Sequence, residues 1–117
     1  MPDDAVIGSR QVHIKEKHMA ESYKGQAVGV FEMDTLVACF VGLDAAAKTA
    51  AIKVQNIERN RLKAGACVKI RGSVSDVEAA MAAALKAAEP YGKLTSSTVI
   101  ASPSEDAEKA MYMTANK

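Results

Sequence analysis

The sequence predicts an α+β fold, in which a four-stranded antiparallel sheet carries two main helices on one face, with a short C-terminal helix after the sheet. Three observations predict it. Short segments with the alternation or β-branched content of strands recur along the chain. Two of them are each followed directly by an apolar stretch with helical spacing. Two others are separated by a short loop that contains glycine, which is typical of a β-hairpin.

The first strand and helix are predicted from Ala27 onward, in AVGVFEMDTLVACFVGLDAAAKTA. Strand-forming residues come first, and either Asp34 or Thr35 is suited to cap the helix that follows. Asp44 and Lys48 lie four residues apart on the exposed side of this helix, a spacing that gives a weak ion pair, and on the residues alone they serve solubility. The expected buried stripe consists of Leu36, Cys39, Phe40, Leu43 and Ala47.

A hairpin is predicted next. Residues 51–61 alternate Ile52, Val54 and Ile57 with polar residues, and a loop at residues 60–65 separates them from a second strand at residues 66–71.

The second helix is rich in alanine and begins after Gly72. Ser75 and Glu78 have the spacing of a capping box, and Pro90 with Gly92 marks the end of the helix. Because its side chains are small nearly all round, we expect other backbones to approach it closely. The expected apolar face consists of Val77, Met81, Ala84, Leu85 and Ala88.

A fourth strand is predicted at residues 95–100 and a terminal helix at residues 105–113. The order strand, helix, strand, strand, helix, strand is a split βαβ pattern of the ferredoxin-like type. Residues 27–117 are expected to form this domain. Residues 1–26 are a polar extension, which is expected either to contribute a short edge strand at residues 12–17 or to remain flexible.

Composition argues against several classes of function. The net charge is +1, and no basic stripe with interleaved aromatic residues indicates nucleic acid as a partner. No segment has the pattern of a signal peptide or a membrane span, so we expect a cytosolic protein without a membrane partner. The cysteines Cys39 and Cys67 are expected to be small buried residues, and His13 and His18 are poorly spaced for a metal site. With no catalytic motif either, we expect no cofactor and no enzymatic activity.

Four phrases of the chain, in order and with matching intervals, carry a family resemblance. They are Gly29-Val30-Phe31-Glu32, Asp44-Ala45-x-x-Lys48, Arg71-Gly72-x-Val74, and Val99-Ile100 closing at Pro103. Over about residues 27–108 the sequence resembles the hexamer-forming shell proteins of bacterial microcompartments.

The resemblance implies cyclic hexamers that pack edge to edge into a wall around enzymes, with other shell proteins as partners. It assigns Lys48 to the hexamer edge, near Asp44, Ser102 and Pro103. It also implies that the hairpin loop lines a central pore with Arg61, Leu62, Lys63, Ala64 and Gly65. Six basic loops around one channel would favour anionic metabolites.

The chain departs from the family pattern at two places. Ser102 stands where many relatives have an arginine that inserts into the neighbouring hexamer, so edge association is expected to be weaker. The extension before the first strand is also longer than usual. The alternative reading is a cytosolic, oligomeric regulatory protein of the same fold that senses a small molecule.

Overall fold

The computed structural model of the protein describes residues 23–60 and 64–115. The chain divides into two compact units, residues 25–103 and residues 1–24 with 104–117. In the second unit the described helix is α5, whose first turn is capped by the Ser104 hydroxyl, which accepts from the backbone N–H of Ala107 at 3.1 Å. The elements in chain order are β1 (Ala27–Met33), α3 (Leu36–Thr49), β2 (Lys53–Arg59), β3 (Ala66–Gly72), α4 (Val74–Ala88), the 3-10 helix η1 (Glu89–Tyr91), β4 (Leu94–Ile100) and α5 (Glu105–Ala115).

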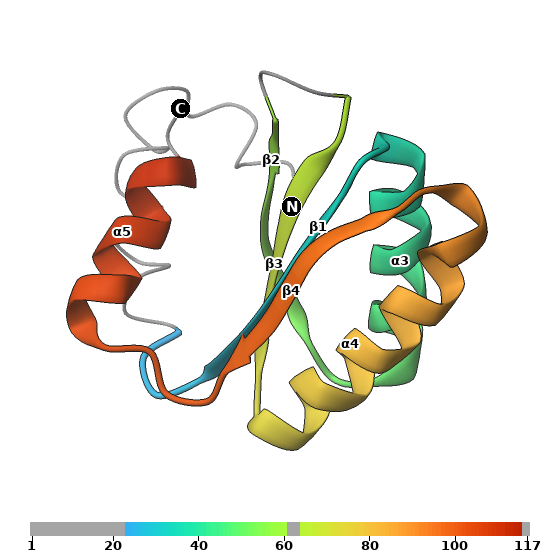
Figure 1. Cartoon of the computed structure of the whole chain (residues 1–117). Coiled ribbons are helices and arrows are strands. Elements are labelled where there is room, and N and C mark those ends of the chain that lie inside the picture. Colours follow the sequence, from blue (N-terminus) through green and yellow to red (C-terminus); the bar gives the residue numbers. More distant parts are fainter. Residues whose placement is uncertain (1–22, 61–63, 116–117) are drawn as a thin grey trace, which may run out of the picture. The chain divides into compact units, whose positions relative to one another are not determined.

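The four strands form one antiparallel sheet in the order β2-β3-β1-β4, and α3 and α4 cover one of its faces (Figure 1). This is the split βαβ arrangement that the sequence predicted. The central strands β1 and β3 pair along their full length, from Ala27 opposite Gly72 to Met33 opposite Ala66. β2 pairs antiparallel with β3, from Lys53 opposite Arg71 to Arg59 opposite Ala66, so the hairpin predicted between the second and third strands is confirmed.

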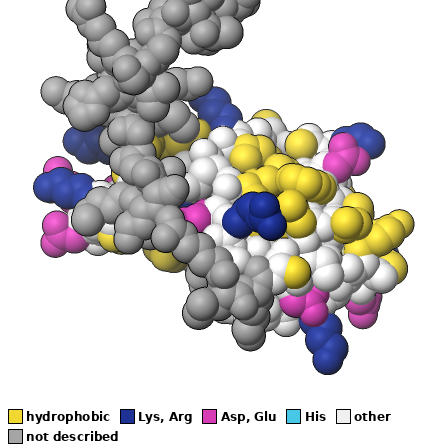
Figure 2. Space-filling view, turned by 90° about the horizontal axis from the view of Figure 1, so that it is seen from above, with side chains coloured by type: hydrophobic (Ala, Val, Ile, Leu, Met, Phe, Trp, Pro, Cys, Tyr) yellow, Lys and Arg dark blue, Asp and Glu magenta, His cyan; other side chains and the backbone are white. Residues whose placement is uncertain are grey.

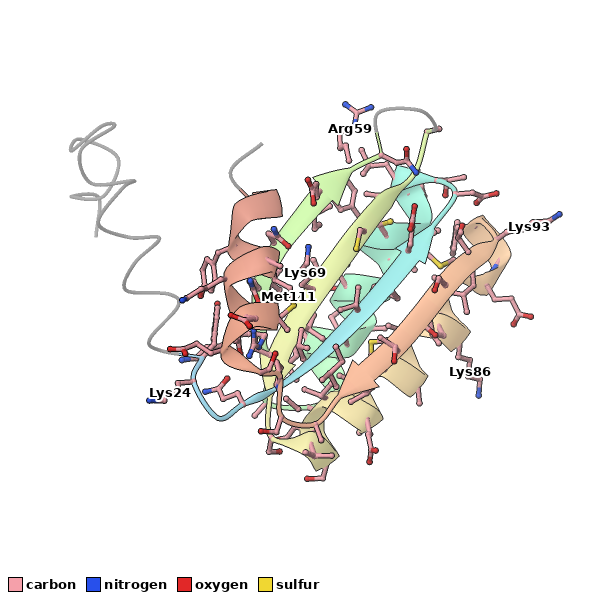
Figure 3. The ribbon with its side chains drawn as sticks, turned by 60° about the vertical axis from the view of Figure 1, so that its left-hand side comes forward. Lys24, Arg59, Lys69, Lys86, Lys93 and Met111 are labelled. Atoms are coloured by element: carbon pink, nitrogen blue, oxygen red, sulfur yellow. The ribbon has the colours of Figure 1, made fainter. Side chains whose placement is uncertain are left out.

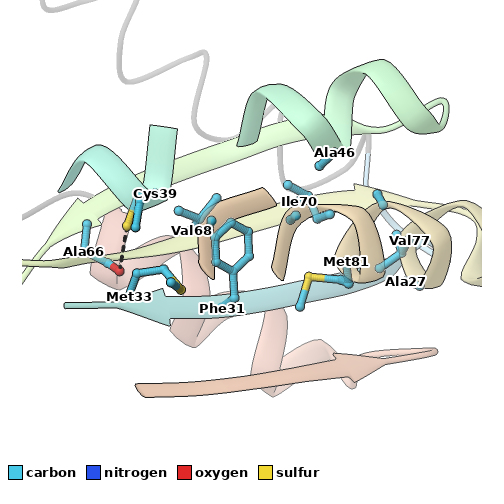
Figure 4. Packing of buried hydrophobic residues seen from close by; sticks show 14 residues of the cluster. Ala27, Phe31, Met33, Cys39, Ala46, Ala66, Val68, Ile70, Val77 and Met81 are labelled. Carbon is cyan, nitrogen blue, oxygen red and sulfur yellow. Dashed lines mark hydrogen bonds between the residues drawn. The ribbon is translucent and has the colours of Figure 1, made fainter. Parts of the chain in front are cut away.

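The core lies between the sheet and the two helices (Figure 4). Alternate residues of β1 and β3 point toward the helices, among them Phe31 and Ile70, which are fully buried. From α4, Val77 and Met81 pack against them, as the helical spacing predicted. From α3, Cys39 lies over the end of β3 and donates from Sγ to the carbonyl oxygen of Ala66 at 3.4 Å.

The two helices pack closely because small residues face one another. A Cβ atom added to Gly42 of α3 would lie 3.1 Å from the carbonyl oxygen of Ala84 and 3.4 Å from the Cβ of Ala88, both on α4. A larger residue at position 42 would push the helices apart. The expectation that an alanine-rich α4 admits close backbone approach is met by α3 within the same chain.

The buried stripe predicted for α3 was partly wrong. Cys39 is buried and Leu36 and Leu43 pack against the core, but Phe40 is 54% exposed and Ala47 is exposed. The buried face of α3 is rotated around the helix relative to the predicted one, because α3 packs against α4 as well as against the sheet. Small residues, not large ones, line its contact with α4. The residues buried on α3 are Ala38, Cys39, Gly42 and Ala46.

The predicted cap of α4 was also wrong by two residues. Ser73, not Ser75, is the N-cap, and its hydroxyl accepts from the backbone N–H of Asp76 at 3.1 Å. Only Ser73 separates the end of β3 at Gly72 from the start of the helix at Val74. Ser75 therefore already lies inside the helix and cannot be its N-cap. At α3 the cap is Thr35, one of the two predicted candidates.

A shift of register in β2 explains why the alternation predicted there does not hold throughout. Between Val54 and Asn56 the pairing with β3 slips by one residue, so Ile57 and not Asn56 lies opposite Val68. Val54, on this edge strand, is 40% exposed, while Gln55 is buried. The guanidinium of Arg71, fully buried on β3, donates from Nη1 to Oε1 of Gln55 at 3.0 Å. The extra residue in β2 thus supplies an acceptor to a buried cation on the sheet face opposite α3 and α4.

Candidate functional site

The base of the β2–β3 loop is held tightly at one end of the sheet. The backbone N–H of Asn60 donates to the carbonyl oxygen of Gly65 at 2.9 Å, which closes the loop. Gly65 is buried, and a Cβ atom there would collide with the backbone of Met33 and Asp34. Of the predicted loop residues, Ala64 is exposed, and Arg61, Leu62 and Lys63 lie outside the described residues.

A side-chain contact ties the same loop to β1. Asn60 donates from Nδ2 to Oε2 of Glu32 at 3.0 Å, across 28 positions of sequence. Glu32 stands in a phrase that the sequence singled out, but its position at the loop was not predicted. The signal available was weak: a carboxylate one residue from the end of a central strand.

The N-terminus of α3 lies at this end as well. Asp34 accepts the backbone N–H of Lys93 on Oδ1 at 2.7 Å, and the Thr35 hydroxyl donates to the carbonyl oxygen of Tyr91 at 2.8 Å. Gly92 between them leaves no room for a Cβ, which would lie 2.7 Å from Asp34 Oδ1. These contacts fix the start of α3 beside the loop end of β1.

The ion pair predicted on α3 is present. Nζ of Lys48 lies 2.8 Å from Oδ2 of Asp44, and both side chains are largely exposed. The hydrogen bond that the ammonium donates to this carboxylate, and then the charge of the carboxylate, raise the pKa of Lys48. The lysine is therefore fully charged at neutral pH, with two further N–H donors on its ammonium.

The other two residues predicted for the edge lie at the same end of the sheet as the C-terminus of α3. Ile100, the last residue of β4, pairs with Val28 at the start of β1, and Ser102 and Pro103 follow it. The C-terminus of α3 reaches this end too, because a Cβ on Gly72 would lie 3.2 Å from the carbonyl oxygen of Ala51. Ser102 is exposed and Pro103 half-buried, and among the described residues no hydrogen bond joins Ser102 to Lys48.

The predicted site residues therefore fall into two groups at opposite ends of the unit formed by residues 25–103 (Figure 1). Thr35 is at the loop end and Lys48 lies 13 residues further along the helix. At about 1.5 Å of rise per residue, the two ends are roughly 20 Å apart.

Charges around the loop end are mixed. Arg59, the last residue of β2, projects from the sheet beside the loop, whereas Lys69 lies along the sheet surface (Figure 3). The Lys69 side chain is only 8% exposed, and its Nζ lies 3.9 Å from Oε1 of Glu58. Viewed toward the loop end, hydrophobic side chains gather on the side of the helices (Figure 2).

The described part of the chain contains neither a candidate metal site nor a candidate membrane span. Within residues 23–60 and 64–115, no group of three or more histidine, cysteine, aspartate or glutamate side chains is placed to hold a metal ion. His13 and His18 lie outside these ranges. No helix in the described part of the chain is long and apolar enough to cross a membrane.

Both cysteines are buried or half-buried thiols. Burial raises the pKa of Cys39 and of Cys67, so each thiol is protonated at neutral pH. The prediction that Cys39 is a buried packing residue is confirmed, and Cys67 is less enclosed than expected.

Comparison with known proteins gives two findings. A family model described as the BMC domain matches residues 27–103. Among solved structures, the chain is similar to one described as a microcompartment protein from Desulfitobacterium hafniense DCB, with 28% sequence identity and a TM-score of 0.65. That similarity covers 71% of this chain and 47% of the other, so the chain spans about half the length of the protein it matches. A comparison with curated proteins gives no match.

The family match begins at the first residue of β1 and ends three residues after β4. It therefore includes the whole sheet, both covering helices, the loop and the Asp44–Lys48 pair. The match runs over well more than half of the 117 residues. The chain belongs to the BMC-domain family of bacterial microcompartment shell proteins.

Proposed function

We propose that this protein is a non-enzymatic shell tile, which closes into a cyclic homohexamer and associates with neighbouring tiles and other shell proteins to enclose enzymes in the bacterial cytoplasm. Residues 27–117 form the shell domain in this proposal, and residues 1–26 are an extension. The observation that carries it is the separation of the loop and the Asp44–Lys48 pair at opposite ends of the unit formed by residues 25–103.

A ring needs an inner end that meets its copies at the axis and an outer end that faces the next ring. A hydrogen bond from Asn60 to Gly65 closes the loop base and Gly65 is packed against β1, so this end suits the crowded axis. Lys48 projects at the other end of α3 with its ammonium exposed. Its two remaining donors are available to carbonyl oxygens of a symmetry-related tile across a two-fold contact.

Exposed apolar residues on α3 support a contact along this helix between copies of the chain. Val37 is 57% and Phe40 is 54% exposed, and they share the outer stripe of the helix with Asp44 and Lys48. A pair of large hydrophobic side chains on one helix face is unfavourable in water and is relieved when a neighbouring copy covers it. We assign this stripe to contacts between copies.

The loop supplies the proposed pore. Each copy carries Arg61 and Lys63 between Asn60 and Gly65, so a ring of six places twelve cationic side chains around one opening. Such a ring attracts anions and repels cations. We therefore propose that small anionic metabolites pass through the pore. Planar lipid-bilayer recordings that show selection for cations would contradict this part of the proposal.

The tile is proposed to associate weakly at its edge. Ser102 is exposed and its side chain is short. It lacks the planar guanidinium through which an arginine can donate several hydrogen bonds to a neighbouring tile. We propose that the protein is a minor shell component or one that assembles with partner tiles.

Light scattering coupled to size-exclusion chromatography, followed by electron microscopy of concentrated protein, tests the proposal. A shell tile gives hexamers that associate further into sheets or tubes. A small-molecule sensor of the same fold would stop at a closed ring. Its elution volume would change when its ligand is added and would not change with protein concentration.

A further inference from the structure

The unit formed by residues 25–103 has two flanks, one at each edge of its sheet. β2 and β4 are the edge strands. On one side, Cys39 of α3 donates to the carbonyl oxygen of Ala66 on β3, the neighbour of β2. On the other, a Cβ added to Gly29 of β1, the neighbour of β4, would lie 2.9 Å from Cγ of Met81 on α4. The outer sides of β2 and α3 therefore form one flank, the β2 flank, and those of β4 and α4 form the β4 flank.

Two large apolar side chains are exposed on the β2 flank. On α3, Gly42 faces α4 and Cys39 faces β3. Because successive helix residues are turned by about 100°, Phe40 points to the side of Cys39 away from Gly42, over β2. Val54 of β2 pairs with the buried Ile70, so its side chain lies on the helix side of the sheet. Phe40 is 54% exposed and Val54 is 40% exposed, so both are open to a neighbouring molecule.

The β4 flank presents small side chains instead. On α4, Met81 faces β1 and Ala84 lies against α3, so the same rotation turns Ala82 outward, over β4, where it is exposed. Ser97 of β4 pairs with the fully buried Phe31, which places it on the helix side of the sheet. Ser97 is nevertheless exposed, because α4 leaves this part of the sheet uncovered. The small residues leave room for a larger side chain from another molecule.

The two flanks also carry opposite charges. Lys53 and Arg59, both exposed, are the first and last residues of β2. Glu78 and Glu89, both exposed, belong to α4 and to its C-cap, which keeps a helical backbone. They share the side of the helix that carries Ala82, because spacings of four and eleven residues are close to whole turns. Within residues 23–60 and 64–115 none of these four charged side chains takes part in an ion pair.

The charges follow the same order along both flanks. Lys53 lies at the end of the sheet where α4 begins, and Glu78 is one turn into that helix. Arg59 borders the β2–β3 loop, and Glu89 begins η1, which the Thr35 hydroxyl holds at the loop end. The two cations are separated by about 20 Å of strand and the two carboxylates by about 17 Å of helix. When copies are arranged with every loop toward one axis, the cations of one flank can therefore face the carboxylates of the next.

We propose that the β2 flank of one copy docks on the β4 flank of the next copy. Phe40 lies against the small side chains of the partner flank, and each cation of the β2 flank lies opposite a carboxylate of the β4 flank. The inference rests on the ring proposed above and names the surfaces that form its contact. Because the two surfaces differ, the contact is heterologous and repeats head to tail until the ring closes. The apolar centre supplies affinity, and the charges decide which flank meets which.

Exchanging one pair of charges tests the contact. Lys53→Glu and Glu78→Lys each place like charges opposite one another in every contact of the ring. We expect each to raise the protein concentration at which half of the chains are in rings by about threefold or more, measured by light scattering. The double variant restores opposite charges and should return this concentration to within about twofold of the native value. Lys48→Glu, at the end of α3 and outside both flanks, is the matched control and should leave it unchanged.

Phe40→Ser tests the apolar centre of the contact. Phe40 does not belong to the core, so the variant should fold, with the circular dichroism spectrum of the native protein. We expect the concentration at which half of the chains are in rings to rise by about tenfold or more, as for an aromatic residue at the centre of an interface.

The outcomes separate this inference from the proposed function. A native protein that forms no ring overturns the proposed function itself. Native rings whose half-assembly concentration is the same in Lys53→Glu, Glu78→Lys and Phe40→Ser would leave the ring standing and overturn the docking of these two flanks. Weakened single variants with no recovery in the double variant would overturn the placement of Lys53 opposite Glu78.

Discussion

Nζ of Lys48 lies 2.8 Å from Oδ2 of Asp44, one turn earlier on α3, while 76% of the lysine side chain stays exposed. The pair directs the lysine along the helix without enclosing it. In an isolated chain such a contact contributes little to stability, because both groups remain in water. Its proposed role is therefore in assembly, where the oriented ammonium meets carbonyl oxygens of another tile.

Lys48→Ala is expected to leave the hexamer intact and to reduce the sheets or tubes seen by electron microscopy of concentrated protein. The substitution removes the donors at the end of α3 away from the loop and touches neither the core nor the loop. Lys86→Ala, which removes an exposed lysine from α4, is the control and should assemble as the native protein does. Loss of the hexamer itself in Lys48→Ala would show that the residue lies in the ring contact.

Assembly that depends on Lys48 should persist far into alkaline solution. Asp44 raises the pKa of Lys48 above its ordinary value of 10.5. A lysine with a raised pKa contributes its charge at all lower pH values and loses it as the pH passes through that pKa. Sedimentation of assembled protein against pH should be level from pH 7 to 10; a decline near pH 8 would point to some other group.

Gly65→Ala is expected to destabilise the protein by about 3 kcal/mol or more, because the added methyl group meets the backbone of β1 and not a side chain that can move aside. The backbone of Gly65 is not in the left-handed region, so the cost is purely steric. Ala64→Ser at the exposed neighbouring position should change the free energy of unfolding by less than about 0.5 kcal/mol. Urea denaturation measures both, and equal stability of the two variants would mean that the loop base can move off β1.

The start of α4 allows a test with a built-in control. Ser73→Ala should cost about 1 kcal/mol, since its hydroxyl accepts from the backbone N–H of Asp76 and also donates to the Asp76 carboxylate at 3.0 Å. Ser75→Ala should cost less than about 0.5 kcal/mol, because Ser75 does not cap the helix. Thermal unfolding measures both losses of stability. A larger loss in Ser75→Ala than in Ser73→Ala would favour Ser75 as the cap, as the sequence predicted.

The fold could be predicted because it depends on local patterns. Alternation in β1 and β3 places Phe31 and Ile70 in the core, and a glycine-containing loop between two strands identifies the hairpin. The helical spacing of apolar residues misleads where a helix packs against another helix as well as against the sheet. Phe40 was assigned to the core from helical spacing, but α4 occupies the adjacent face of α3 and leaves Phe40 in solvent.

The site could be predicted in part. The Asp44–Lys48 pair follows from a spacing of four on a helix and is present. The contact between Glu32 and Asn60 joins residues 28 apart on different strands, and no local pattern encodes it. It emerges only when the register of β1, β3 and β2 is known. The roles assigned to Arg61, Leu62 and Lys63 remain predictions from the family resemblance.

The central claim is that copies of this chain close into a six-membered ring with the β2–β3 loop toward the axis. Light scattering of the purified protein across a hundredfold range of concentration, with single-particle electron microscopy of the same sample, tests it most directly. The account predicts a mass six times the 12.3 kDa of the chain and six loops around a central opening. A monomer at the highest concentration, or a ring whose loops point away from its axis, would contradict it.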